Sequence, residues 1–239
     1  MREQPAPTDR PWLDGDLVRR PRTAVAVSLS MLGTVALLTA LVALDVARPA
    51  FLQGVDGAWR RAVLAWPALA RRTGDVFERV GAGTVMVPLR LAVAAWLVVR
   101  RRRWDLAAWL LGWALADLLT AAMKPGLARE RPTATDPENP FTSFPSAHAK
   151  TAAQVSVGIV LVATSPWRPR RAWYGLAVAW TVAMALSRTV VDHHWLSDVV
   201  AGSLLGAGAA VLAAAIVRAV RDRGSKGSAG EPARGQRDT

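Results

Sequence analysis

The stretch Ser187-Arg-Thr-Val-Val-Asp-His-His-Trp-Leu-Ser-Asp198 interrupts an otherwise apolar run and carries two of the three histidines of the chain. Asp198 follows His194 by four residues, a spacing that places both side chains on one face of a helix, close enough to pair. A histidine held by a carboxylate can act as a nucleophile or a base. Arg188 adds a guanidinium suited to phosphate oxygens. The third histidine, His148, lies in a second polar patch, and we expect the fold to bring both patches together.

The composition indicates a membrane protein with several spans. Of the 239 residues, 52% are hydrophobic and 11 are Trp, and several uncharged runs approach the ~20 residues that a helix needs to cross a bilayer. The net charge of +12 does not favour nucleic acid as a partner, because the arginines cluster at the ends of apolar runs, as membrane topology requires. The chain has no cysteine, which excludes disulfides, thiolate metal sites and cysteine nucleophiles.

Six apolar runs predict an all-α fold, a polytopic membrane bundle of six transmembrane helices that forms one domain over residues 24–217. The polar, basic residues 1–23 and 218–239 are expected to be disordered cytoplasmic tails. The fourth and fifth runs have only 15 uncharged residues each, or ~22 Å of helix, so their polar ends must lie near the outer edge of the hydrocarbon. The six runs cover residues 24–44, 80–99, 106–123, 151–165, 172–186 and 199–217.

Small residues and charges inside these runs predict two helix contacts. Gly202 and Gly206 have the spacing that permits close approach of a neighbouring helix.

Arg90 and Asp117 each lie about ten residues from the cytoplasmic end of their runs. At ~1.5 Å of rise per residue, the two charges lie at similar depth in the membrane. We expect the two charges to pair, because a lone charge at that depth is costly. The alternative is that each faces a wet cavity separately.

Residues 45–79, between the first two runs, mix Trp and Leu with Arg. This pattern fits one or two amphipathic helices at the membrane surface in the first extracytoplasmic segment. It fits equally well ordinary loop helices that pack on the bundle.

The distribution of basic residues predicts the topology. Of the 30 Lys and Arg residues, 18 lie in the two tails and in the loops after the second and fourth runs. Both termini of this multi-pass cell-membrane protein are therefore expected on the cytoplasmic side. Segments 124–148 and 187–198 then share the extracytoplasmic face, as a common site requires.

Three polar clusters would meet on that face and provide three cations, a hydroxyl and two histidines. Such a group of cations near lipid requires an anion, and a tetrahedral phosphate is the natural one. Ser146 is well placed to cap the fourth helix, so that the N–H groups of Ala147 and His148 would point at the anion. The clusters are Lys124 to Pro132, Phe144 to His148 and Ser187 to Asp198.

These clusters read Lys-x6-Arg-Pro, Pro-Ser-x-His and Ser-Arg-x5-His-x3-Asp, and they resemble the three-part signature of the type 2 phosphatidic acid phosphatase (PAP2) superfamily, which is related to vanadium haloperoxidases. The likeness covers Lys124 to Asp198, and the six-span layout is similar to the membrane branch of that family. Ala147 stands where the family usually has Gly, but Ala supplies the same backbone N–H. Of the doublet His193-His194, the spacings from Arg188 and to Asp198 select His194.

The resemblance implies a two-step hydrolysis that needs no metal and no cofactor. His194 would attack phosphorus and form a phosphohistidine, and Asp198 would orient its ring. His148 would protonate the leaving oxygen and then activate water. The groups that would hold the phosphoryl oxygens are Lys124, Arg131, Ser146, Ala147 and Arg188.

The favoured function is therefore a membrane phosphatase acting on a lipid phosphate or diphosphate, such as phosphatidic acid, phosphatidylglycerol phosphate or polyprenyl diphosphate, among membrane lipids. One alternative is a phosphotransferase or a phosphatase for a soluble ester. Another is a non-catalytic anion-binding or transport protein on the same scaffold, although pure binding would not need two histidines and a carboxylate.

Four nearby cations also have simpler interpretations. Lys124 and Arg131 could be interfacial anchors whose charges reach the headgroups. Lys150 matches no motif position, and we expect it to face the rim or to reach the headgroups. Arg129 is expected at the rim of the site.

Overall fold

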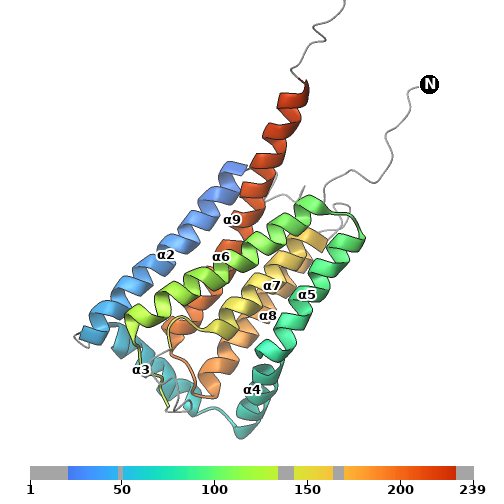
Figure 1. The fold of residues 1–239 in the computed structure, drawn as a ribbon. Coiled ribbons are helices and arrows are strands. Elements are labelled where there is room, and N and C mark those ends of the chain that lie inside the picture. The colour runs from blue at the N-terminus through green and yellow to red at the C-terminus, as the bar shows by residue number, and fades with distance from the viewer. Residues whose placement is uncertain (1–20, 48–50, 134–142, 164–169, 230–239) are drawn as a thin grey trace, which may run out of the picture.

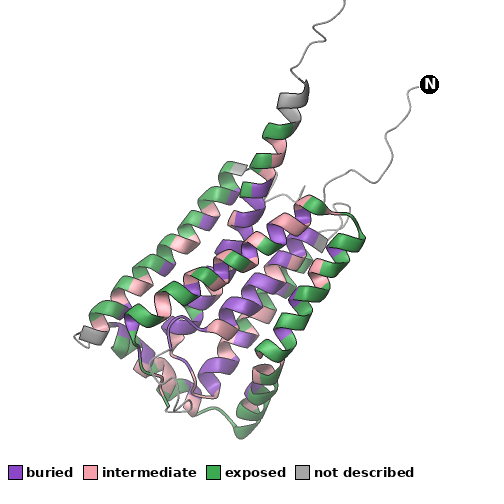
Figure 2. Ribbon diagram, in the orientation of Figure 1, coloured by how far each residue is buried: buried purple, intermediate pink, exposed green. Residues whose placement is uncertain are grey.

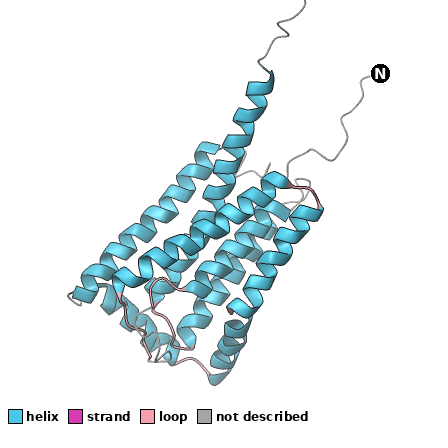
Figure 3. Ribbon diagram, in the orientation of Figure 1, coloured by secondary structure: helices cyan, strands magenta, loops and turns pink. Residues whose placement is uncertain are grey.

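The computed structural model describes residues 21–47, 51–133, 143–163 and 170–229. These residues form eight helices and no strand, so the all-α prediction is confirmed for the described part of the chain (Figures 1 and 3). The helices are α2 (Pro21–Ala47), α3 (Phe51–Leu64), α4 (Ala68–Gly81), α5 (Gly83–Val99), α6 (Arg103–Leu127), α7 (Ala147–Ala163), α8 (Arg170–Val190) and α9 (Leu196–Ala229).

Three helices are long and apolar enough to cross a membrane, and they lie within α2, α6 and α9. Helices α4 and α5 meet at a 47° bend and would provide a fourth span if they cross together. The helix α7 has only 17 residues, or about 26 Å, and α8 has arginines near both of its ends. The chain is a membrane protein, and the expectation of six spans stays a prediction.

The helix boundaries differ from the expected runs mainly at their ends. The expected second span, residues 80–99, is interrupted because Ala82 is extended, with ψ 152°, between Gly81 and Gly83. Helix α2 begins at Pro21 and α9 continues to Ala229, so both enter the segments expected to be tails. The rest of those segments, 1–20 and 230–239, lies outside the described residues.

Helix α9 lies at the centre of the bundle and packs against α2, α6 and α7. Figure 2 shows buried residues along α7 and α9, whereas α2 and α5 are largely exposed on their outer faces. Gly202 and Gly206 permit the closest of these approaches. A Cβ on Gly202 would meet the carbonyl of Ser146, and one on Gly206 would meet the carbonyl of Lys150 and lie 2.9 Å from the backbone nitrogen of Gln154. The predicted small-residue contact is confirmed, and it fixes the first turns of α7 against α9.

The charges inside the bundle are paired, as expected. Arg90 on α5 lies 3.1 Å from Asp117 on α6, and its guanidinium stacks on Trp113, 4.9 Å from the ring centroid. Lys150 on α7 also binds the Asp117 carboxylate, and only 5% of Lys150 is exposed. The expectation that Lys150 faces the rim or the headgroups is therefore wrong, because this part of α7 is held inside the bundle and Lys150 reaches the carboxylate of α6.

Residues 45–79 contain the helices α3 and α4. Helix α3 packs against α2, α8 and α9, and α4 packs against α5, α7 and α8. This is the arrangement expected of loop helices that pack on the bundle. Both helices lie at the end of the bundle where α6 and α8 finish and where α7 and α9 begin (Figure 1).

The close contact of Gly206 with the backbone of α7 predicts that a larger residue at this position destabilises the protein. We expect Gly206→Ala to lower the free energy of unfolding by about 1–3 kcal/mol, because backbone atoms of α7 would have to move. Thermal unfolding in detergent would measure this loss. Gly33→Ala on α2 is the matched control, since its Cβ would meet nothing within 4 Å. Equal unfolding temperatures for both variants would contradict the proposed packing role of Gly206.

Candidate active site

Three segments far apart in the sequence meet at the end of the bundle that holds α3 and α4. The backbone N–H of Ser146 donates to the carbonyl of Asp198 over 3.0 Å. The backbone N–H of Ser143 donates to the carbonyl of Arg129 over 3.1 Å, which brings in the segment after α6. His148 lies within electrostatic range of Arg188 and His194. The predicted convergence of the two histidine patches is therefore confirmed.

The turn between α8 and α9 places His194. The carbonyl of Arg188 accepts hydrogen bonds from the N–H groups of His193 and His194, at 3.1 and 3.2 Å. Asp192 takes the left-handed conformation, with φ 61°, which Asp tolerates better than most residues. Its carboxylate accepts two hydrogen bonds from Arg60 on α3, each 2.7 Å long, so the turn is held from outside as well.

His194 and Asp198 lie side by side, as their spacing predicts. Nδ1 of His194 lies 3.4 Å from Oδ2 of Asp198, which leaves Nε2 as the ring nitrogen that faces away from the carboxylate. Burial lowers the pKa of the His194 imidazole below its ordinary value of 6.5, although Asp198 opposes this shift. The ring is therefore neutral at pH 7 and able to act as a nucleophile.

The carboxylate of Asp198 is completely buried and accepts further hydrogen bonds. Oδ2 accepts from the hydroxyl of Ser143 over 2.5 Å and from the backbone N–H of Trp195 over 3.0 Å. Oδ1 accepts from Nη1 of Arg129 over 2.5 Å. These bonds fix the position of the carboxylate beside His194.

Arg188 is 2% exposed, yet much of its guanidinium has no hydrogen-bond partner among the described residues. Its Nη2 contacts Nδ1 of His193 and lies 3.4 Å from Oε1 of Glu78 on α4, whereas Nε and Nη1 make no hydrogen bond. Buried donors are rarely left without a partner in folded proteins. These two donors suit an anion held in two-point contact.

Two other predicted phosphate ligands, and the predicted acid–base residue His148, have buried polar atoms in the same state. Within the described segments these are Oγ of Ser146, Nε2 of His148 and Nε of Arg131. Arg131 is half-buried, and its Nη1 lies 3.4 Å from the carbonyl of His193. The three side chains come from the segments that meet around His194, so the arrangement provides several donors for one tetrahedral anion.

Helix α7 begins at Ala147, so Ser146 occupies the predicted position before its first turn. Among the described residues the Ser146 hydroxyl has no hydrogen-bond partner, so the expectation that it caps α7 is wrong. The hydroxyl is left for a ligand, and the N-terminus of α7 favours negative charge there. Gly81, where α4 ends, permits the close approach of α4 to His148. A Cβ at Gly81 would lie 2.7 Å from Cδ2 of that ring.

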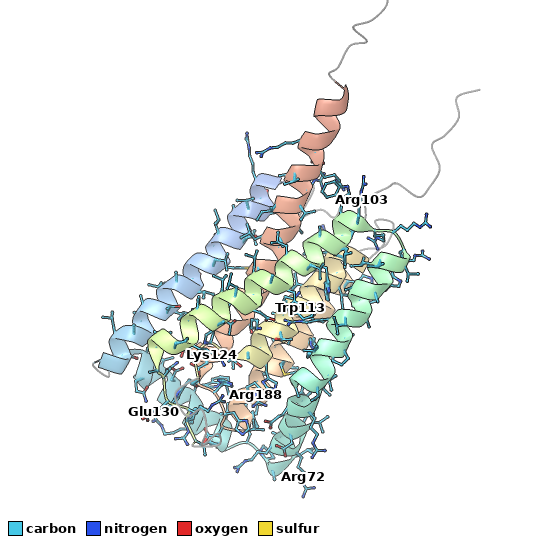
Figure 4. The ribbon with its side chains drawn as sticks, in the orientation of Figure 1. Arg72, Arg103, Trp113, Lys124, Glu130 and Arg188 are labelled. Carbon is cyan, nitrogen blue, oxygen red and sulfur yellow. The ribbon has the colours of Figure 1, made fainter. Side chains whose placement is uncertain are left out.

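Lys124 lies in the last turn of α6 and is half-buried. Figure 4 places it at the same end of the bundle as Arg188 and at the opposite end from Arg103. Its part in holding phosphate stays a prediction.

Arg129 is not at the rim, and that expectation is wrong. It is 5% exposed, it binds Asp198, and its Nη2 donates to Oδ2 of Asp56 on α3 over 2.6 Å. The left-handed conformation of Ala128, with φ 43°, ends α6 and sends the following residue into the bundle.

Sequence reasoning also missed Asp56, Ser143 and Glu78. Ser143 immediately precedes the Phe144 to His148 cluster, and Glu78 lies two residues before the expected second run. No sequence pattern marks Asp56.

No group of three or more His, Asp or Glu residues in the described segments is arranged to hold a metal ion. Independence from metal stays a prediction.

Comparison with known proteins gives the family. The sequence pattern of the PAP2 superfamily matches residues 105–222, which include all three clusters. Residues 105–222 form a PAP2 superfamily domain. Among its relatives is phosphatidylglycerophosphatase B of Bacillus subtilis (strain 168), 30% identical over 133 residues. That match covers 53% of this chain and 65% of the relative, just under two thirds of its length.

Two solved structures resemble this PAP2 protein. One is the transmembrane PAP2-type phosphatidylglycerolphosphate phosphatase from Bacillus subtilis, with a TM-score of 0.68 and 25% identity, over 82% of this chain and 96% of that one. The other is LpxE of Aquifex aeolicus, with a TM-score of 0.53 and 18% identity, over 65% and 92% of the two chains. At that identity LpxE supports the fold alone. The family predicted from the three clusters is thus confirmed.

The unpartnered donors of Arg188 lead us to predict that this side chain binds an anion. We expect Arg188→Gln to weaken binding of inorganic phosphate by about 1.5–3 kcal/mol, tenfold or more in Kd, because a charged donor is lost. Isothermal titration calorimetry in detergent would measure this. Arg103→Gln, at the other end of the bundle, is the matched control.

Since Arg188 is buried, the unfolding temperature of each variant should be recorded, and Arg188→Lys should be tested beside Arg188→Gln. A folded Arg188 variant that binds phosphate as tightly as the wild-type protein would show that the site lies elsewhere.

Proposed function

We propose that this PAP2 protein is a membrane phosphatase that hydrolyses the phosphomonoester or diphosphate of a lipid through a phosphohistidine. The observation that carries the proposal is the place of His194: its Nδ1 lies 3.4 Å from the carboxylate of Asp198, and beside it stand buried donors without hydrogen-bond partners among the described residues. A nucleophile, a second histidine and donors for three phosphoryl oxygens are what such a reaction needs.

The geometry supports a two-step reaction. Because Nδ1 of His194 faces Asp198, Nε2 attacks phosphorus, and the P–O bond to the lipid breaks as the N–P bond forms. Burial and the positive charge of Arg188 lower the pKa of the His148 imidazole to about 4 in the ligand-free protein, and we propose that the bound phosphate anion raises it again. His148 then gives a proton to the leaving oxygen and later removes one from the water that breaks the N–P bond. Asp198 stabilises the positive charge that His194 acquires, and inorganic phosphate leaves.

The phosphoryl oxygens lie among the predicted ligands during both steps. The buried donors act in a water-poor site, where they stabilise developing charge better than they would in water. Arg188 contributes two unpartnered donors and Arg131 one. The full proposed set is Lys124, Arg131, Ser146, the N–H of Ala147 and Arg188.

A lipid substrate is supported by the place of the site. It lies where α7 begins and α8 ends, beside helices apolar enough to cross a bilayer. The names of the Bacillus relatives favour phosphatidylglycerol phosphate among the candidates, beside phosphatidic acid and polyprenyl diphosphate.

The proposal includes six spans, cytoplasmic termini, an extracytoplasmic site and no metal or cofactor. The clustering of 18 of 30 Lys and Arg residues on one predicted side supports this topology. Arg103, from the basic run assigned to the cytoplasm, lies at the opposite end of the bundle from Arg188 (Figure 4).

The central test is an assay of lipid phosphates and polyprenyl diphosphates with purified protein and a chelator present. We expect phosphate release from at least one substrate, and we expect His194→Ala to lower kcat by about a thousandfold or more, since the nucleophile is lost. Rapid quenching of a reaction whose substrate carries a radioactive phosphate should trap a phosphohistidine in the wild-type protein but not in His194→Ala. Retained activity in a folded His194→Ala variant would end the assignment.

The same assay separates the alternatives. Transfer of the phosphoryl group to an added alcohol would identify a phosphotransferase, and preference for a soluble ester would exclude a lipid phosphatase. Phosphate binding without turnover would favour the anion-binding protein.

The protonation state of His194 gives a further prediction. Because burial lowers the pKa of its imidazole, we expect the ring to stay neutral on acidification through pH 6.5, and kcat/KM to fall only below that value. Nitrogen NMR of labelled histidine is practical because the chain has three histidines, and His194→Ala would assign the signal. A His194 that becomes protonated above pH 6.5 would contradict the expectation.

A further inference from the structure

Arg129 joins two buried carboxylates that come from opposite parts of the chain. Its Nη1 donates to Oδ1 of Asp198 over 2.5 Å and to the hydroxyl of Ser197 over 2.7 Å. Its Nη2 donates to Oδ2 of Asp56 over 2.6 Å. The face of the guanidinium also lies against Trp195, 5.7 Å from the ring centroid. Both terminal nitrogens of Arg129 are therefore engaged with protein partners, although Arg129 stands inside the first motif.

Asp56 is the outer end of this chain of contacts, and it is 1% exposed. Oδ1 accepts the backbone N–H of Ser197 over 2.9 Å, and Oδ2 accepts the Ser197 hydroxyl over 2.6 Å as well as Arg129. Ser197 immediately precedes Asp198. Helix α3 thus holds the start of α9 at the residue beside the catalytic carboxylate.

The charges explain why a second carboxylate matters there. A buried arginine next to Asp198 alone would neutralise much of the negative charge that His194 needs when it becomes positive. With Asp56 on its other side, the single positive charge of Arg129 is shared between two carboxylates. Asp198 then keeps negative charge for the imidazolium, and no buried charge is left unpaired.

We propose that Asp56 is a positioning residue of the active site, which acts through Arg129 and Ser197 to set the place and the effective charge of Asp198. This inference rests on the proposed function, since Asp198 matters only if His194 reacts. It makes α3 part of the catalytic apparatus and gives the Asp45–Arg79 segment a defined role.

Other charged groups also face the His194–Asp198 pair, and the test must leave them unchanged. The pair is faced directly by Arg129 and Arg131 after α6, by His148 on α7 and by Arg188 on α8. Two further groups, Glu78 on α4 and His193 in the turn, lie against Arg188.

The decisive variant is Asp56→Asn, which keeps the shape of the side chain but removes its charge. We expect kcat to fall about tenfold or more with KM unchanged, because Asp56 contacts none of the proposed phosphate ligands. We also expect the acid limb of the kcat/KM profile, and the His194 titration seen by NMR, to move to lower pH, because a less negative Asp198 stabilises the imidazolium less.

The matched control is Arg60→Gln. Arg60 also ties α3 to the turn, through Asp192, but it makes no contact with Asp198. Because Arg60 also holds the turn that carries His194, its loss can lower kcat, but we expect the acid limb and the His194 titration to stay at their wild-type pH. If Asp56→Asn leaves kcat and the profile unchanged, or if both variants lose activity and stability together with an unchanged profile, α3 is only a tether and the proposal is wrong.

Asp56→Glu covers the case in which the Asn variant does not fold. It retains the charge, so the acid limb and the His194 titration should stay at their wild-type pH even if kcat falls, and a displaced limb would overturn the proposal. Failure of the proposed function is distinguishable, since it would appear as wild-type turnover that does not depend on His194. The NMR titration would still report whether Asp56 acts on His194.

Discussion

The buried carboxylate of Asp198 is the constraint on which the site depends. A charge with no exposure to water must be compensated by donors and an opposite charge, or it would destabilise the fold by several kcal/mol. The compensation comes from Ser143, Trp195 and Arg129, which belong to segments on both sides of α7. The convergence of the three polar clusters is therefore also a requirement for burying this one group.

The contact between α7 and α9 makes that convergence geometrically possible. Two glycines on α9 let the backbone of Ser146 and Lys150 lie against it, so His148 and Asp198 are carried by helices in direct contact. The buried cations of Lys150 and Arg90 then bind the partly exposed carboxylate of Asp117 and hold α5, α6 and α7 together. The site is thus supported by close packing on one side and by paired charges on the other.

The sequence was sufficient wherever a regular spacing determines the contact. The pairing of His194 with Asp198 follows from their spacing of four residues across the start of α9, and that of Arg90 with Asp117 follows from equal depth. Arg129 was misplaced because its direction depends on a left-handed residue, Ala128, that is not a glycine. Asp56 could not be found, because its partners are defined only when α3 docks on α9 and no local pattern encodes that docking.

The pairing of the cations separates those that build the site from those that serve a ligand. Arg129 is buried, and its donors are directed to two carboxylates and a serine, so its charge is used by the protein itself. Arg188 is equally buried but keeps Nε and Nη1 unpartnered, and Arg131 keeps Nε. Glu78 reaches only Nη2 of Arg188, so the remaining donors of these two side chains are left around His194. An anion that arrives there completes the pairing, and it does so beside the one histidine that a buried carboxylate has already oriented.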